Sequence, residues 1–379
     1  MLQGAGLSNG VNFMPRHLNK SYKKNQKRKS YPKKVTKKRG RKKPVPALQK
    51  LPENPIIAPI KKHKWESWQT FNPAAFFEDG KVHLLYRAIG EDGVSRLGYA
   101  ASYDGINIDE RLKEPVFTYS SGAPDLLKAK PYHAFEYASG GSWAGCEDPR
   151  ITRIGDTIYM LFVSFDGRNI PRLAITFISL EDFLKKRWKW GGVKIISPPG
   201  IIDKSGCLFP EKIKGKYVIL HRIFPNILID FVDDLNFKDG QYLKGEYSIK
   251  VRKNYWDSRK IGAGAPPIKT KYGWLLIYYG VDDLDFLKYK IGAMLLDFKN
   301  PAKVLYRTDE PILEPIEWYE YEGHKAGIVY PCGAVVIKSK LFVFYGGADT
   351  VVCVATANLE EFLQALMHTK KPKLKPVSA

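Results

Sequence analysis

The 379-residue sequence lacks long hydrophobic runs, which argues against a helical membrane protein. Its longest apolar stretches, such as residues 274–281 (WLLIYYGV), are far shorter than the ~20 residues that a membrane-spanning helix needs. The first residues also lack a charged segment followed by an apolar one, so no secretory signal is visible. We therefore expect no membrane span and a cytoplasmic location.

Cysteine is scarce, and the standard metal, nucleotide and hydrolase motifs are absent. The four cysteines are scattered without any C-x-x-C pair, so neither a disulfide framework nor a structural zinc site is expected. The glycine-rich segment 262–267 (GAGAPP) lacks the spacing of a phosphate-binding P-loop. No G-x-S-x-G or H-E-x-x-H motif is present. We expect no metal and no organic cofactor.

Acidic residues are missing from residues 1–50, which hold sixteen lysines and arginines. The formal charge of +22 falls to +6 without this segment. The densest part, residues 20–43, cannot bury apolar surface and is predicted to be disordered. It is either a solvated tail or an attachment to polyanions such as nucleic acid or anionic lipid. We divide the chain into a basic tail (1–50) and one globular domain (51–379).

Helical periodicity is also rare, with residues 180–188 and 358–367 the best candidates. A β-hairpin pattern instead recurs five times, each time as a proline followed by a turn and two strands rich in aromatic and β-branched residues. The first predicted strands are 82–88, 157–165, 217–223, 274–281 and 341–348. Their predicted partners are 96–102, 172–179, 226–232, 289–297 and 350–357.

The prolines that open these units are spaced by 76, 61, 57 and 64 residues. They are Pro73, Pro149, Pro210, Pro267 and Pro331. A β-sandwich has no reason to repeat one motif five times, whereas an all-β repeat of this length is typical of a propeller. The sequence therefore predicts an all-β fold, a five-bladed β-propeller with a disordered basic extension. Equivalent strand ends would then converge on one axial pocket.

The predicted strand ends carry an unusually polar set of carboxylates, cations and tyrosines. Such a set suits a polyhydroxylated ligand that can also carry negative charge, because carboxylates accept hydrogen bonds from sugar hydroxyls and Arg or Lys can hold phosphate. Structural interpretations stay open: Asp148 beside a proline could cap a turn, His221 could be a core histidine, and Arg222 could pair with Asp233 or Asp234.

The polar segments also resemble those of glycoside hydrolase family 130. The similarity runs from about residue 60 to residue 365, in order and through every repeat. Its main segments are NPAAFFEDGKVHLLYRA, GCEDPRIT, LFPEKIKGKYVILHR, WDSRKIGAGAPPI, GWLLIYYGV, PILEP and YGGADTVVCVATA. The resemblance implies a five-bladed propeller that acts on β-mannosides, as an inverting phosphorylase or, in some members, as a hydrolase.

The resemblance also implies roles for individual residues. Asp148 would be the general acid, acting through a sugar hydroxyl. Substrate would be held by Asn72, Arg87, Glu147, Tyr279 and Asp349, and phosphate by Arg150, His221, Arg222 and Lys260. A phosphorylase needs such cations because phosphate replaces the water and the catalytic base of an inverting hydrolase. Family phosphorylases usually read Tyr-His-Gly where this chain reads Tyr278-Tyr279-Gly280, which weakens the case for phosphate without removing it.

These expectations combine into one predicted activity. We expect a phosphorylase that cleaves β-mannosides, either β-1,4-mannosyl oligosaccharides or mannosyl-GlcNAc or mannosyl-glucose, with inorganic phosphate as co-substrate and α-mannose 1-phosphate as product. A β-mannosidase of the same family is the near alternative. A non-catalytic, glycan-binding propeller is the alternative of another class. Members of the family often oligomerise, so a homo-oligomer is a further expectation.

Overall fold

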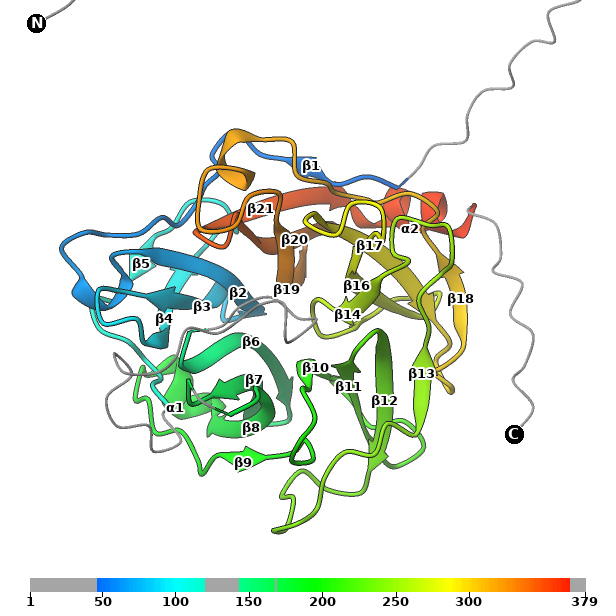
Figure 1. Cartoon of the computed structure of the whole chain (residues 1–379), viewed down its shortest axis with the longest axis horizontal. Coiled ribbons are helices and arrows are strands. Elements are labelled where there is room, and N and C mark those ends of the chain that lie inside the picture. Colours follow the sequence, from blue (N-terminus) through cyan, green and yellow to red (C-terminus); the bar gives the residue numbers. More distant parts are fainter. Residues whose placement is uncertain (1–45, 120–142, 168, 369–379) are drawn as a thin grey trace, which may run out of the picture. The chain divides into compact units, whose positions relative to one another are not determined.

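Antiparallel strands make up nearly all of the regular structure (Figure 1). The structure, a computed structural model, describes residues 46–119, 143–167 and 169–368, which lie in one compact unit that begins at Lys43. The basic block 20–43 falls outside these residues. Residues 46–50, which the sequence analysis assigned to the tail, are part of this unit, because Gln49–Lys50 forms a strand within it.

The described strands form antiparallel meanders that follow the predicted repeat. The first holds β2 (Gln69–Glu78), β3 (Lys81–Ile89), β4 (Ser95–Ser102) and β5 (Glu110–Arg111), and the second β6 (Gly145–Ile154), β7 (Thr157–Phe165), β8 (Arg172–Ser179) and β9 (Lys194–Ile195). The third holds β10 (Lys204–Leu208), β11 (Tyr217–Ile223), β12 (Asn226–Val232) and β13 (Tyr247–Ile249). The fourth holds β14 (Lys260–Ala263), β15 (Ile268–Lys269), β16 (Trp274–Val281), β17 (Tyr289–Leu296) and β18 (Val304–Arg307). The fifth holds β19 (Val329–Ile337), β20 (Lys340–Gly347), β21 (Val351–Asn358) and the early strand β1 (Gln49–Lys50).

Hydrogen bonding divides the described strands into four sheets, none of which closes on itself. The first two meanders count as one eight-stranded sheet because Ser95 of β4 pairs in parallel with Gly145 of β6. The fifth meander is completed by β1, which pairs with β21, and Lys50 forms an ion pair with Glu320. The beginning and the end of the described chain are thereby joined in one sheet.

The core lies between neighbouring meanders, where their apolar faces meet. Leu84 of β3 packs in one buried cluster with Phe344 of β20, and Leu275 of β16 packs in another with Val343 of β20. Both faces of the middle strands are therefore buried, and this explains why Trp274–Val281 consists of apolar and aromatic residues and one glycine, without polar alternation.

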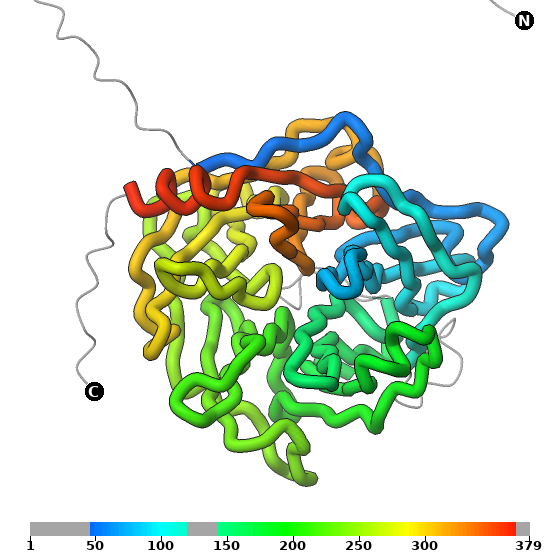
Figure 2. The backbone as a smooth tube through the Cα atoms, turned by 180° about the vertical axis from the view of Figure 1, so that it is seen from behind, coloured from blue at the N-terminus to red at the C-terminus, as the bar shows by residue number. Residues whose placement is uncertain are grey.

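Both predicted helices are confirmed as short elements after the third strand of a meander. They are α1 (Leu180–Leu184) and α2 (Leu359–Met367). Ser179 and Asn358 cap them by accepting hydrogen bonds from backbone N–H groups of the first turn. Figure 2 shows α2 at the edge of the fifth meander, where it packs against β17, β18 and β21. None of the helices among the described residues has the length and apolar content to cross a membrane.

Candidate active site

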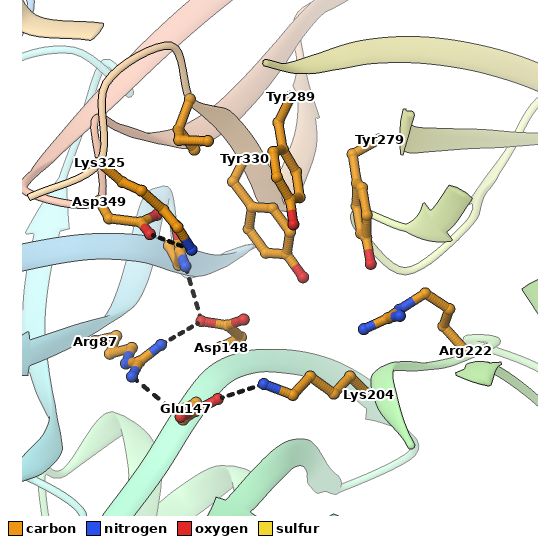
Figure 3. A pocket seen from close by; sticks show the side chains of 12 residues that line it. Arg87, Glu147, Asp148, Lys204, Arg222, Tyr279, Tyr289, Lys325, Tyr330 and Asp349 are labelled. Carbon is orange, nitrogen blue, oxygen red and sulfur yellow. Dashed lines mark hydrogen bonds and ion pairs between the residues drawn. The ribbon is translucent and has the colours of Figure 1, made fainter. Parts of the chain in front are cut away.

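One polar cavity gathers residues from all the meanders. The space between its walls, part of which is open to solvent, is about 470 Å³. Its lining is Asn72, Arg87, Glu147, Asp148, Lys204, Arg222, Tyr279, Tyr289, Lys325, Ile328, Tyr330 and Asp349. Two sides can be distinguished (Figure 3). We call Asn72, Arg87, Glu147, Asp148 and Asp349 the carboxylate wall, and Arg222, Tyr279, Tyr289 and Tyr330 the arginine wall.

A repeated β-bulge places the central residues of the carboxylate wall. The first strands β2, β6 and β10 each shift register against their neighbours, and Asn72, Asp148 and Ser205 at these shifts have φ values of 48°, 50° and 57°. This left-handed conformation is uncommon for residues other than glycine and is often found at functional sites. The bulges bring Asn72 and Asp148 together, and Asn72 Nδ2 donates a hydrogen bond of 2.8 Å to Asp148 Oδ1.

The charges of the carboxylate wall are paired with one another or with the neighbouring Lys204 and Lys325 (Figure 3). Arg87 lies 3.2 Å from Asp148 Oδ1 through one terminal nitrogen and 3.2 Å from Glu147 Oε1 through the other. Lys204 Nζ lies 3.2 Å from Glu147 Oε2. These pairs keep the wall nearly balanced in charge, so it can offer hydrogen bonds to the hydroxyls of a neutral ligand.

The two aspartates of the wall have different proton affinities. Burial alone would raise the pKa of Asp148, but the charges of Arg87 and Arg150 and the hydrogen bond from Asn72 outweigh it and lower the pKa. Burial raises the pKa of Asp349, and the neighbouring charge of Asp148 adds to this effect against the opposing charge of Lys325. In the free protein Asp148 is therefore the ionised member of the pair, and Asp349 holds a proton more readily.

The arginine wall contains a buried cation that forms no ion pair with a described residue, although, against the lowering effect of burial, the charge of Asp203 helps to raise its pKa. Arg222 is 3 % exposed, and its guanidinium makes no hydrogen bond or ion pair with another residue in the described part of the chain, Asp233 and Asp234 included. Figure 3 shows it pointing into the space between Asp148 and Tyr279. A buried charge is costly without a partner, so this position is suited to an anionic ligand.

Tyrosine hydroxyls surround this guanidinium. Ser205 Oγ shares hydrogen bonds of 2.9 Å with the Tyr279 hydroxyl and 3.2 Å with the Tyr330 hydroxyl. The rings of Tyr279 and Tyr330 lie 4.7 Å apart, and Tyr289 packs against both. Hydroxyls can donate to an anion without bringing further charge, so the arginine wall offers one positive charge among neutral donors.

Strand alternation explains why neighbouring polar residues have different environments. Arg222 faces the cavity, whereas His221 before it points to the opposite face of β11, because successive side chains alternate. There His221 Nδ1 lies 2.7 Å from Asp203 and Nε2 lies 2.8 Å from Asp230. Burial lowers the pKa of His221, but these two carboxylates outweigh it and raise the pKa to about 9. His221, predicted to bind phosphate, is therefore placed outside the cavity lining.

Two other predicted phosphate residues also lie behind the lining. Arg150 donates to the backbone carbonyls of Asp148 (2.8 Å) and Gly264 (3.1 Å), and to the Tyr330 hydroxyl (3.2 Å). Lys260 Nζ lies 4.6 Å from the centre of the Tyr289 ring, and burial together with the charge of Arg222 holds its pKa well below the usual range. Of the four predicted phosphate residues, only Arg222 lines the cavity, whereas all five predicted substrate residues and Asp148 do so.

Five lining residues have no role in the sequence-based prediction: Lys204, Tyr289, Lys325, Ile328 and Tyr330. Tyr289 begins a partner strand and Tyr330 precedes the proline of the fifth repeat, so the repeat pattern could have indicated both. Lys325 lies in an irregular loop, and its Nζ is 3.8 Å from Asp349 Oδ2. No local pattern marks such a loop residue.

Comparisons with known proteins identify a family of mannoside phosphorylases. A family profile described as β-1,4-mannooligosaccharide phosphorylase, that of glycoside hydrolase family 130, matches residues 47–368. The chain is 39 % identical over 322 residues to a 1,2-β-oligomannan phosphorylase of Thermoanaerobacter sp., covering 83 % of this chain and 98 % of the relative. It is 33 % identical to a β-1,4-mannooligosaccharide phosphorylase of Ruminococcus albus, covering 75 % and 80 %. The solved structure of a Listeria innocua β-1,2-mannobiose phosphorylase with β-1,2-mannobiose aligns with a TM-score of 0.65 at 26 % identity, covering 84 % and 99 %.

Proposed function

Because the chain belongs to glycoside hydrolase family 130, we propose that it is a β-mannoside phosphorylase, which transfers the terminal mannose of an oligosaccharide to inorganic phosphate. The observation that carries the choice of phosphate is the buried guanidinium of Arg222, which faces the cavity without a counter-ion among the described residues. Attack from the face opposite the leaving sugar would give α-mannose 1-phosphate.

The fold that accompanies this proposal is a five-bladed propeller, with each meander as one blade. Its support is the position of the first strands, since β2, β6, β10, β14 and β19 lie nearest the middle of Figure 1. Residues of four of these strands, or directly beside them, line the cavity. A central cavity that is lined by residues of every blade is the usual ligand site of such a fold.

Asp148 is the proposed proton donor to the leaving sugar, either directly or through a sugar hydroxyl as the family resemblance implies. Its lowered pKa in the free protein means that it must gain its proton when the substrates bind. An incoming phosphate dianion favours this step, because a nearby like charge raises a carboxyl pKa. As the glycosidic C–O bond breaks and a phosphate oxygen bonds to the anomeric carbon, the proton passes from Asp148 to the leaving oxygen. The proton of HPO₄²⁻ then restores Asp148.

The remaining residues divide between the two walls. Asn72, Arg87, Glu147 and Asp349 would hold the hydroxyls of the reacting mannose, since their charges are already paired. Arg222 would bind phosphate together with the hydroxyls of the arginine wall, including Tyr279. Arg150, His221 and Lys260 would then support the wall from behind.

The proposed substrates are β-linked mannooligosaccharides. Relatives in the comparison act, by their names, on β-1,2 and on β-1,4 linkages, and the chain is more similar to the β-1,2 member. We therefore place β-1,2-linked mannooligosaccharides first. A cytoplasmic location remains part of the proposal, supported by four free, buried cysteines.

The deciding experiment is product analysis with and without phosphate. The protein is incubated with β-1,2- or β-1,4-mannobiose, and mannose and mannose 1-phosphate are quantified. We expect mannose 1-phosphate, and only when phosphate is present. Release of free mannose at the same rate in phosphate-free buffer would indicate a hydrolase, and absence of any product would favour a glycan-binding protein.

A further inference from the structure

Three aromatic side chains form a continuous group on the surface of the described unit. The ring centres of Trp68 and Trp143 lie 6.0 Å apart, and those of Trp143 and His324 lie 5.9 Å apart. Trp68 is 47 % exposed and His324 is also exposed, whereas Trp143 between them is half-buried. Large aromatic side chains usually bury most of their surface, and a group of them left open to solvent often marks a binding site.

This group, which we call the aromatic platform, borders the cavity. Trp68 precedes β2, four residues before Asn72, and Trp143 precedes β6, four residues before Glu147. His324 is the neighbour of Lys325, which lines the cavity.

Backbone contacts hold the platform beside the carboxylate wall. The backbone N–H of His324 donates to Thr350 Oγ1 at 2.8 Å, next to Asp349. The Trp143 ring packs on Gly93, where an added Cβ would come within 3.2 Å of the ring. The platform therefore lies on the side of Asp148 and Asp349, and the arginine wall comes from the other strands β11, β16, β17 and β19.

The chemistry of the platform fits a neutral saccharide. Indole faces pack against the C–H face of a pyranose ring, while the ring edges leave its hydroxyls free for hydrogen bonds. His324 can take part in them: its partial burial is the main cause that lowers its pKa, so its ring is neutral and has one donor and one acceptor.

We propose that the aromatic platform binds the leaving saccharide, at the sugars that follow the first leaving unit. The inference rests on the proposed phosphorylase function. Phosphate on the arginine wall attacks the anomeric carbon, so the leaving saccharide departs on the opposite side, toward Asp148 and the platform. Because the platform is exposed outside the cavity, it contacts the second leaving sugar and not the first. It thereby makes the enzyme prefer longer chains.

The test compares chain lengths in platform variants. The kcat/KM for phosphorolysis is measured on the disaccharide and the trisaccharide of whichever series, β-1,2 or β-1,4, the wild type cleaves faster. We expect Trp68→Ala and Trp143→Ala each to reduce the preference for the trisaccharide about tenfold, equivalent to ~1.4 kcal/mol. Activity on the disaccharide should change little, and Trp68→Phe should keep most of the preference. Phe177→Ala is the matched control, since Phe177 is 48 % exposed on β8.

Two results would overturn the inference. One is a trisaccharide preference that is absent from the wild type or unchanged in both tryptophan variants. The other is an equal loss in Phe177→Ala. Calorimetric binding of the trisaccharide without phosphate separates this inference from the proposed function, because it needs no turnover. Suppose that the protein shows no phosphorolysis but that Trp68→Ala binds the trisaccharide about tenfold more weakly than the wild type. The platform would then be supported and the phosphorylase function rejected.

Discussion

The two walls of the cavity differ in whether their charged side chains form ion pairs. On the carboxylate wall, Arg87 is within 3.2 Å of both Glu147 and Asp148, and Lys325 accompanies Asp349. On the arginine wall, Arg222 is just as deeply buried but has neutral tyrosine hydroxyls around it. A wall whose charges are already satisfied suits a neutral ligand, whereas one with an unpaired cation suits an anion. The comparison supports the proposed division of the cavity into a sugar side and a phosphate side.

The largest expected effect comes from removing the acid of the carboxylate wall. Asp148→Asn keeps the shape and the hydrogen bond from Asn72 but has no proton to give, so turnover should fall by ~10²–10⁴-fold. Single-turnover and steady-state rates measure the loss, and thermal unfolding verifies the fold. Asp349→Asn is the matched control and should lose less. A variant that keeps more than about a tenth of the activity would assign the acid to another residue, Glu147 first.

Removing the Arg222 side chain should weaken the binding of phosphate and leave the binding of the saccharide nearly unchanged. Arg222→Ala removes a charge-assisted contact worth roughly 1.5–3 kcal/mol, so the KM for phosphate should rise about ten- to hundred-fold. The KM for the saccharide should change little, because that ligand is neutral. Lys260→Ala is the comparison variant, and we expect a smaller rise, since Lys260 lies behind Tyr289. Equal changes in both KM values for Arg222→Ala would contradict the division between the walls.

His221, which lies behind the arginine wall, should make the free energy of unfolding depend on pH. The pKa of His221 is about 9 in the folded protein and 6.5 when unperturbed, so protonation stabilises the fold. This contribution is complete below pH 6.5 and is lost as the pH rises through 9. It amounts to on the order of 3 kcal/mol. Denaturant unfolding between pH 6 and pH 10 should show the loss in the wild type. In His221→Gln the pH dependence should be shallower. If the free energy of unfolding changed with pH in the same way in the wild type and in His221→Gln, His221 would not be charged in the folded protein.

The smallest effect on catalysis should come from the basic tail, since both walls belong to residues after position 68. Deletion of residues 1–45 should leave kcat/KM nearly unchanged and spare β1. Weak, salt-sensitive binding to DNA or anionic vesicles should disappear with it. A truncated protein that loses activity, or an intact one that binds no polyanion at low salt, would show that the tail has a different role.

The sequence predicted the two middle strands of each meander closely, because each lies between clear turn signals, but it did not predict the strands that open the meanders, β2, β6, β10, β14 and β19. The predicted ranges 217–223 and 274–281 coincide with β11 and β16. Residues Asn72 and Asp148 were also located, since each precedes a proline at the same point of the repeat. What the sequence does not reveal is the bulge that turns them inward, because a register shift depends on the neighbouring strand.

Three of the four residues predicted to bind phosphate do not line the cavity, and two physical reasons account for their positions. His221 and Arg222 are adjacent in a strand, so they cannot both face the cavity, and alternation could have separated them. Arg150 is different: its side chain is held by carbonyls of residues 263 and 264, contacts between distant segments that no local pattern shows. The same is true of Lys325, which reaches the cavity from a loop.

Equilibrium binding of phosphate to the free protein tests the division of the cavity most directly. Calorimetry is carried out without saccharide on the wild type, on Asp148→Asn and on Arg222→Ala. We predict one phosphate per chain for the wild type and for Asp148→Asn, and binding about ten- to hundred-fold weaker for Arg222→Ala. Equal phosphate affinity in the wild type and in Arg222→Ala would contradict the account, because the arginine wall would then not be the anion site.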